Sequence, residues 1–324
     1  MKRTSHALPL LAVVTAALAL AGCGGVGNLT ETSGSPAPLQ VTYASFGESV
    51  GFVATVTKSL QAAADAAGVE LSVLDNQNDA ATAVDNARQA ATTDPDVFIE
   101  YNGNADSNSR VASLMADASI PVIAVQYPIE GAPLFAIDNT QVGEIGGSQL
   151  AAAAQEKWGE DETPAALIVT LPQGGPIQLD RSEGAKAAIS DTYPDIEFTD
   201  VDSRSDAAVG RQLAADFLTS HPDEPVIIWA HVDSVGLGVV AAVEASGRDD
   251  VLVMSTGGDA AIFPEIRKAG TPLVGTVGLF PESWGSVLID LAQKVAAGEE
   301  VPEVTHPEKI EVISAANIGQ LYPE

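Results

Sequence analysis

The stretch from Pro225 to Gly258, PVIIWAHVDSVGLGVVAAVEASGRDDVLVMSTGG, decides the fold. It opens with a β-rich run, continues with a segment from 233 to 246 whose apolar residues have helical spacing, and ends with a second β-rich run. Both runs are nearly continuous in apolar residues, which is typical of strands covered by helices on both faces of a parallel sheet. The stretch therefore predicts a β-α-β unit.

The same alternation extends in both directions along the chain. In the first Ala-rich segment, Val53, Val56, Leu60 and Ala64 fall on one helical face, and Gly68 stands where a C-terminal cap belongs. Further helices are expected over 182–190, 206–218 and 261–268. The β-rich runs around these segments are VTYASF, ELSVLD, DVFIEY, PVIAVQ, PAALIVTLP, IEFTDVD and PLVGTVGL. We therefore predict an α/β protein with two doubly wound parallel-sheet lobes.

The N-terminus contains the only cysteine of the 324-residue chain. Lys2 and Arg3 precede an apolar stretch over 7–21, and small residues precede Cys23 in LALAGCGG, a pattern typical of a secretion signal. Leu20-Ala21-Gly22-Cys23 resembles the bacterial lipobox, in which the cysteine becomes the lipidated first residue of the mature protein. The sequence predicts a signal peptide over 1–22, a lipidated Cys23 and a flexible linker over 23–38. It also predicts an extracytoplasmic protein anchored to the cell membrane.

The composition argues against several classes of function. The chain has 44 acidic and 15 basic residues, for a net charge of −29, so it lacks the basic surface that nucleic-acid binding needs. The four histidines have no metal-ligand spacing, and we find neither a Gly-x-Ser-x-Gly elbow nor a phosphate-binding Gly-rich loop. We predict a protein that is not an enzyme and that uses no metal and no cofactor.

From Val41 onward the chain resembles the ribose-binding-protein group of type I periplasmic solute receptors. The stretches that carry the resemblance are GVELSVLDNQND, SIPVIAV, FAIDNTQVGEIGGSQLA, DRSEGAKAAI and VDSVGLGVVAAVEASGRDDVLVMSTGG. The resemblance implies two lobes joined by three chain crossings, with a ligand cleft between them and a monomeric state. By this analogy one lobe comprises 39–140 with 280–305, and the other comprises 141–279 with 306–324.

The resemblance also implies ligand contacts at the ends of the strands. In the family, the loop after the first strand presents polar and aromatic residues to a sugar, and here FGESVGF offers Phe46, Ser49 and Phe52. An aromatic ring fits the apolar face of a sugar. Phe52 fits core packing against the first helix equally well. Asn102, after the third strand, is a further candidate.

Gln126 and Tyr127 stand where the family usually has a charged pair at the end of the fourth strand. Asn139 matches an Asp-Asn pair beside the hinge, which orders the crossing backbone or contacts ligand. Arg181 in LDRSEG matches an arginine that reaches into the cleft, where its donors suit several hydroxyls. The alternative for Arg181 is a surface salt bridge to Asp180 or Glu183.

Three more candidates lie near the later strands. His231 is either a ligand contact or a structural histidine with satisfied ring nitrogens. Asp233 either contacts ligand or caps the helix that follows, and capping is the favoured role. Asp259 comes two residues after the position where the family has an aspartate, which here is Gly257.

These differences from the family affect which ligand the protein can bind. Val232, Gly257 and Leu279 replace polar residues of the family, and a buried hydroxyl without a partner costs about 1–3 kcal/mol. Either the ligand carries fewer hydroxyls than ribose, or other loops supply the hydrogen bonds. We predict a lipoprotein that binds a sugar or polyol and delivers it to an ABC permease. The alternative is a sensory receptor that signals to a membrane kinase or chemoreceptor.

Overall fold

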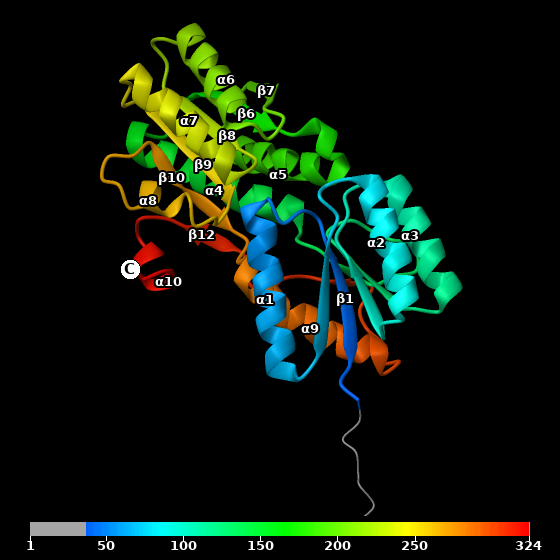
Figure 1. The fold of residues 1–324 in the computed structure, drawn as a ribbon. Helices are drawn as coiled ribbons and strands as arrows, with labels where there is room; N and C mark the ends of the chain where they lie inside the picture. The colour runs from blue at the N-terminus through cyan, green and yellow to red at the C-terminus, as the bar shows by residue number, and fades with distance from the viewer. Residues whose placement is uncertain (1–36, 324) are drawn as a thin grey trace, which may run out of the picture. The chain divides into compact units, whose positions relative to one another are not determined.

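The computed structural model describes residues 37–323, which form two six-stranded sheets (Figure 1). The predicted signal peptide, Cys23 and nearly all of the linker over 23–38 lie outside the described residues. By the contacts that they make with one another, residues 38–324 form one compact unit. The predicted boundaries of the two lobes stay a prediction.

The first sheet has the strand order β11-β5-β4-β3-β1-β2, and all of its paired strands are parallel. Its strands are β1 (Gln40–Ser45), β2 (Glu70–Asp75), β3 (Val97–Glu100), β4 (Val122–Val125), β5 (Leu134–Phe135) and β11 (Val304–Thr305).

The second sheet has the order β12-β10-β9-β8-β6-β7. Its strands are β6 (Ala165–Thr170), β7 (Phe198–Asp202), β8 (Val226–Ala230), β9 (Val251–Gly257), β10 (Leu273–Gly278) and β12 (Glu311–Ile313).

Helices connect these strands. The α-helices are α1 (Gly51–Ala67), α2 (Ala80–Thr93), α3 (Ala105–Ala118), α4 (Asn139–Trp158), α5 (Pro176–Thr192), α6 (Ala207–Ser220), α7 (Asp233–Ser246), α8 (Phe263–Ile266), α9 (Trp284–Ala296) and α10 (Ile318–Leu321). Short 3₁₀ turns, η1 (Pro172–Gly174) and η2 (Pro281–Ser283), precede α5 and α9.

Alternating side chains of the strands pack against helices on opposite faces of each sheet. In the first sheet, Val41 and Tyr43 belong to the core formed with α1 and α9, whereas Ala44 belongs to the core formed with α2 and α3. In the second sheet, Ile168 packs toward α4 and α5 and Leu167 toward α6 and α7. This two-sided burial explains why the strands are almost continuously apolar. It confirms the predicted doubly wound α/β fold.

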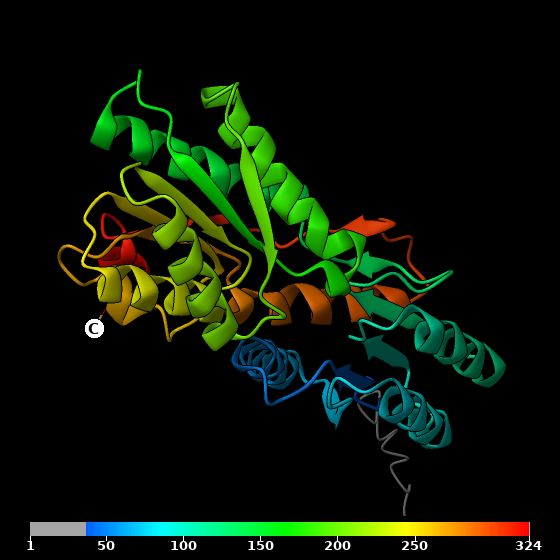
Figure 2. The same cartoon turned by 90° about the horizontal axis from the view of Figure 1, so that it is seen from above.

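One strand departs from the predicted parallel arrangement. β12 runs antiparallel to β10, with Glu311 opposite Gly278 at the carboxyl end of β10. The chain passes between the sheets after β5, after β10 and after β11, and only five residues, 306–310, separate β11 from β12. With no crossover helix in this link, β12 enters the second sheet from the carboxyl edge. In Figures 1 and 2 the C-terminal segment lies beside the second sheet, where Tyr322 packs on Phe263 with ring centroids 4.3 Å apart.

The predicted helices are present, with some differences in length. α7 has the predicted bounds, and α1 ends at Ala67 with Gly68 as its C-cap, in a left-handed conformation with φ 69°. The helix expected over 182–190 begins earlier, at Pro176, whose fixed φ suits a first helical turn. The helix expected over 261–268 is the shorter α8.

α4 and α5 pack at close range, and this packing positions the polar residues at their N-terminal ends. A Cβ on Gly143 would lie 2.0 Å from the Arg181 carbonyl oxygen, and a Cβ on Gly184 would lie 2.3 Å from that of Thr140. Only glycine permits this backbone contact. The approach brings the Arg181 side chain to Asn139 at the start of α4.

Candidate functional site

A cavity of about 850 Å³ lies where the carboxyl ends of strands from both sheets meet. This edge of a parallel sheet is where open α/β folds bind ligands, because loops and helix N-termini converge there. The lining residues that directly follow a strand or are among its last two residues are Phe46, Tyr101, Gln126, Leu171, Thr256, Gly257 and Leu279.

The structure brings most of the predicted site residues to this cavity. Those that line it are Phe46, Phe52, Asn102, Gln126, Tyr127, Arg181 and Asp259. Ser49, Asn139, His231 and Asp233 are not lining residues. Ser49 is exposed in the segment before α1, and the other three are buried beside the cavity.

Two groups of aromatic rings line the cavity. Tyr101 lies between Phe46 and Tyr127, with centroid distances of 5.5 and 6.4 Å. Phe52 packs edge-on against Trp284 at 5.1 Å. Phe52 therefore combines the two predicted roles, since it packs against the core and also lines the cavity.

Three polar side chains that line the cavity have a buried atom without a hydrogen-bond partner. These atoms are Gln126 Nε2, Gln178 Oε1 and Thr256 Oγ1. Gln126 also has φ 63°, a conformation that non-glycine residues rarely adopt. Strained residues cluster at functional sites, and a buried polar atom without a protein partner is open to a hydrogen bond from a bound molecule.

Arg181 is buried and held by neighbouring residues. Its Nε and Nη2 donate to Asn139 Oδ1 at 3.1 and 2.7 Å, and its Nη1 donates to the His231 carbonyl oxygen at 2.9 Å. Burial lowers the pKa of Arg181 to about 10, which leaves it cationic at neutral pH. The surface salt bridge considered from the sequence is wrong, because Glu183 pairs with Lys186 and Arg181 is only 4% exposed.

His231 has partners for both ring nitrogens. Nδ1 lies 3.2 Å from the Val169 carbonyl oxygen and Nε2 lies 2.9 Å from Ser205 Oγ. Burial first, and then the charge of Arg181, lower the pKa of His231 to about 4, so the ring is neutral at physiological pH. Nδ1 therefore carries the proton and Nε2 accepts from the serine. The role of His231 as a satisfied structural residue agrees with this geometry.

Asp233 does not cap α7, so the favoured prediction for it is wrong. The N-cap residue is Val232, with no side-chain cap, and Asp233 is the first residue of the helix. Its carboxylate turns instead toward the second sheet, where the hydroxyls of Ser255 and Thr276 donate to it at 2.6 Å. The capping prediction failed because those donors come from β9 and β10, which are distant in sequence.

Asn102 and Glu100 form a polar layer next to the first group of rings. Asn102 Nδ2 donates to Ser107 Oγ at 2.7 Å, and its Oδ1 accepts from the backbone N–H of Asn104 at 3.1 Å. Glu100 is fully buried, with Asn76 Nδ2 donating to Oε1 at 3.0 Å and no partner for Oε2. Burial raises the pKa of Glu100 to about 8. The carboxyl group is therefore mostly protonated at neutral pH.

Comparison with known proteins assigns the fold and cavity to a family. The model of the periplasmic binding protein domain matches residues 41–300. The chain belongs to the periplasmic binding protein family. The prediction of a binding protein rather than an enzyme is confirmed by this membership.

Relatives of this binding protein include ribose import binding proteins. RbsB of Escherichia coli is 26% identical over 257 residues, covering 77% of this chain and 82% of the relative. RbsB of Bacillus subtilis is 24% identical, covering 80% and 83%.

Solved structures share the fold. A solute-binding protein from Mycobacterium smegmatis with bound glycerol has a TM-score of 0.77 at 24% identity, covering 89% of this chain and 98% of that chain. One from Bacillus halodurans with bound myo-inositol has a TM-score of 0.75 at 20% identity, covering 89% and 99%.

Several residues that line the cavity of this binding protein were missed from the sequence, among them Tyr101, Gln178, Thr256 and Trp284. Tyr101 and Thr256 stand at the ends of β3 and β9, so the rule that ligands meet strand ends could have found them. Gln178 and Trp284 lie on α5 and α9, and no local pattern marks them.

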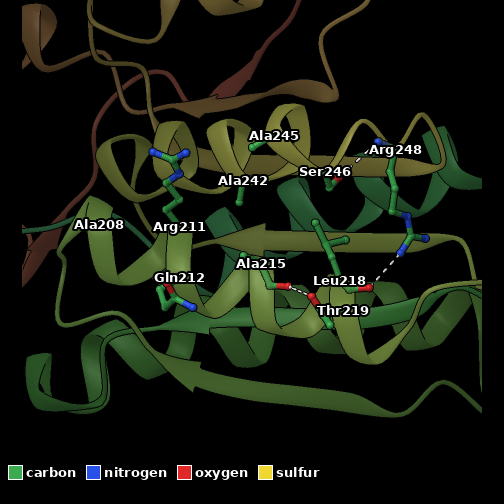
Figure 3. Close-up of a pocket in the computed structure, with 10 residues that line it drawn as sticks. All are labelled: Ala208, Arg211, Gln212, Ala215, Leu218, Thr219, Ala242, Ala245, Ser246 and Arg248. Atoms are coloured by element: carbon green, nitrogen blue, oxygen red, sulfur yellow. Dashed lines mark hydrogen bonds between the residues drawn. The ribbon is translucent and has the colours of Figure 1, made fainter.

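The binding protein has a second, smaller hollow on the outer side of the second sheet. It measures about 570 Å³, lies between α6 and α7, and shares no lining residue with the cavity (Figure 3). Arg248 at its rim donates to Asp250 and to the carbonyl oxygens of Leu218 and His221. The hydrogen bonds of Arg248 are therefore made within the protein, where they stabilise the fold.

Within residues 37–323, no group of three or more His, Cys, Asp or Glu side chains is arranged to hold a metal ion. Over the same residues, no helix has the length and hydropathy of a membrane span.

Proposed function

We propose that this protein is an extracytoplasmic lipoprotein that captures a small sugar or polyol in the cavity and delivers it to an ABC importer. The observation that carries the proposal is the pairing of aromatic rings with buried polar atoms that lack partners. Rings offer flat surfaces to the C–H faces of a sugar, and directed polar groups select its hydroxyls. An unpartnered buried polar atom costs about 1–3 kcal/mol, so a hydroxyl that satisfies it stabilises the complex.

The comparisons support a polyhydroxy ligand. The relatives are named ribose import binding proteins, and solved neighbours hold glycerol and myo-inositol. Val232, Gly257 and Leu279 do line the cavity, but Gln178 and Thr256 supply polar atoms from other positions. This favours a hydroxylated ligand held by a different set of residues over a ligand with few hydroxyls.

The remaining parts of the proposal rest on the sequence. Lys2, Arg3, the apolar stretch and Cys23 support secretion and lipid anchoring. The lobes, 39–140 with 280–305 and 141–279 with 306–324, would close on the ligand about the three crossings as a monomer.

A thermal-shift screen of the purified protein tests the ligand class. The panel contains D-ribose, D-arabinose, D-allose, glycerol, allitol and myo-inositol, with amino acids and nucleosides as the non-carbohydrate group. A ligand that binds only the folded state raises the Tm with concentration, corresponding to about 2.7 kcal/mol at one hundred times Kd. A shift with a sugar or polyol supports the proposal. Shifts confined to the non-carbohydrate group would overturn the ligand class.

Uptake tests the transport step. A strain that lacks this protein should lose high-affinity uptake of the radiolabelled ligand and regain it on complementation. Undiminished uptake in that strain would contradict delivery to an importer.

A further inference from the structure

The Asp233 carboxylate collects four hydrogen bonds in a buried position beside the cavity. Oδ1 accepts from the hydroxyls of Ser255 and Thr276, and Oδ2 accepts from the backbone N–H groups of Gly258 at 2.7 Å and Asp259 at 2.8 Å. The residue is 1% exposed. Burial raises the pKa of Asp233, whereas the four donors stabilise its ionised form. Two carboxylate oxygens offer about four acceptor sites, so none is left for a ligand.

These bonds explain the glycine at position 257. Gly257 has φ 146°, and a Cβ there would lie 2.7 Å from Asp233 Oδ2. The Asp233 carboxylate therefore occupies the space that a side chain at 257 would need. Position 258 is also glycine, so the first side chain that this segment can present to the cavity is that of Asp259, which is half-buried.

We propose that Asp233 is a positioning residue that holds residues 257–259 against the start of α7 and so places the Asp259 carboxyl group in the cavity as an acceptor for a ligand hydroxyl. The acceptor role rests on the proposed function, since it assumes a hydroxylated ligand. The positioning role rests on the hydrogen bonds alone.

The charges around the segment agree with this arrangement. Burial first, and then the negative charge of Asp233, raise the pKa of Asp259 to about 6. The other charged groups that line the cavity are Arg181 from α5 and Arg204 from the segment between β7 and α6. Asp259 is thus mostly ionised at pH 7.5, where its carboxylate only accepts hydrogen bonds, and it becomes protonated as the pH falls through 6.

Two variants separate the geometry from the charge without any ligand. Asp233→Asn can keep the geometry, because its oxygen accepts from both N–H groups while its Nδ2 donates to the rotatable hydroxyls of Ser255 and Thr276. Asp233→Ala removes all four bonds. Asp250→Asn, at the opposite end of β9, breaks an ion pair with Arg248 and serves as the matched control.

The measurements are hydrogen exchange at the Gly258 and Asp259 amides and a ¹³C NMR titration of the Asp259 carboxyl in the full chain. We expect Asp233→Ala to lose the amide protection. Asp233→Asn should keep it and lower the titration midpoint of Asp259, because one negative charge is gone. Absence of protection at the two amides in the wild type would overturn the positioning role even if Asp233→Ala does not fold, and unchanged protection in a folded Asp233→Ala would also overturn it.

The acceptor role is tested with whichever of D-ribose, D-arabinose and myo-inositol binds the wild type most tightly. We expect the wild type to lose affinity below pH 6, as Asp259 is protonated. Asp259→Ala, which removes both acceptor oxygens, should weaken binding roughly 10- to 100-fold at pH 7.5 and remove that pH dependence. Asp250→Asn should change neither. Wild-type affinity in Asp259→Ala would refute the acceptor role. If the wild type binds no sugar or polyol of the thermal-shift panel, the proposed function fails, whereas the exchange results still decide the positioning role.

Discussion

The guanidinium group of Arg181 donates two hydrogen bonds to the side-chain oxygen of Asn139, at 2.7 Å from Nη2 and 3.1 Å from Nε. A third donor, Nη1, bonds to the backbone of His231. The arginine is therefore fixed by groups of the protein itself. A ligand that contacts it meets a preorganised cation and does not have to order a long side chain.

Asn139→Ala removes the acceptor for two buried charged donors. We expect a loss of about 1–3 kcal/mol in the free energy of unfolding, measured by urea denaturation, and weaker ligand binding by calorimetry. Asn139→Asp, which retains an acceptor oxygen, should recover most of the stability. A wild-type urea midpoint in Asn139→Ala would contradict the role of this contact.

Gly184→Ala tests the close packing of α4 and α5. The added methyl group would meet the Thr140 carbonyl oxygen at 2.3 Å, so the helices must separate, and we expect a loss of about 1–3 kcal/mol. Gly319→Ala is the control, because a Cβ there meets nothing within 4 Å. Equal urea midpoints for the two variants would refute the packing argument.

Trp284 lines the cavity, so its fluorescence should report ligand binding. The chain has three tryptophans, and Trp229 and Trp158 are not lining residues. We expect Trp284→Phe to lose most of the change in emission that the best-binding sugar or polyol of the thermal-shift panel causes, while Trp158→Phe retains it. Binding of the variant is checked independently by calorimetry. Retention of the full signal in Trp284→Phe would place the ligand elsewhere.

Glu100 should make the protein less stable as the pH rises. Its folded pKa of about 8 lies above the ordinary value of 4.5, so between these values the unfolded chain releases a proton that the folded protein keeps. This contribution is complete below pH 4.5 and is lost toward pH 8, at up to about 1.4 kcal/mol per pH unit. Glu100→Gln should flatten that slope in urea denaturation. Glu299→Gln, at an exposed position, should leave the slope unchanged. An unaltered slope in Glu100→Gln would disprove the raised pKa of Glu100.

Cys23→Ser tests the proposed anchor. The variant should bind ligand like the wild type but appear in the soluble fraction or the medium after cell fractionation, because no thiol remains to carry a lipid. A variant that stays with the membrane fraction would rule out Cys23 as the anchor.

Much of the fold could be predicted because the sequence pattern that indicates a strand or a helix lies within that element. The apolar runs of β8 and β9 and the helical spacing between them follow from burial on both faces of a sheet, and α7 has the predicted bounds. The direction of β12 could not be predicted, because it depends on where the chain re-enters the second sheet after the last crossing.

The site could be predicted only where a residue adjoins the end of a strand. Phe46, Gln126 and Tyr127 line the cavity because parallel strands present their carboxyl ends at one edge. Trp284 comes from a helix after the second crossing, and its place beside Phe52 depends on how distant segments pack.

The sequence by itself determined the fold class and the edge of the sheets where a ligand site belongs, because hydrophobic periodicity is read from near neighbours. Only the tertiary structure decided what each polar side chain bonds to. Asp233 looked like a helix cap in sequence, yet its partners are Ser255, Thr276 and the backbone at 258–259. Hydrogen bonds act over about 3 Å in space, and the fold brings together groups that lie more than twenty residues apart along the chain.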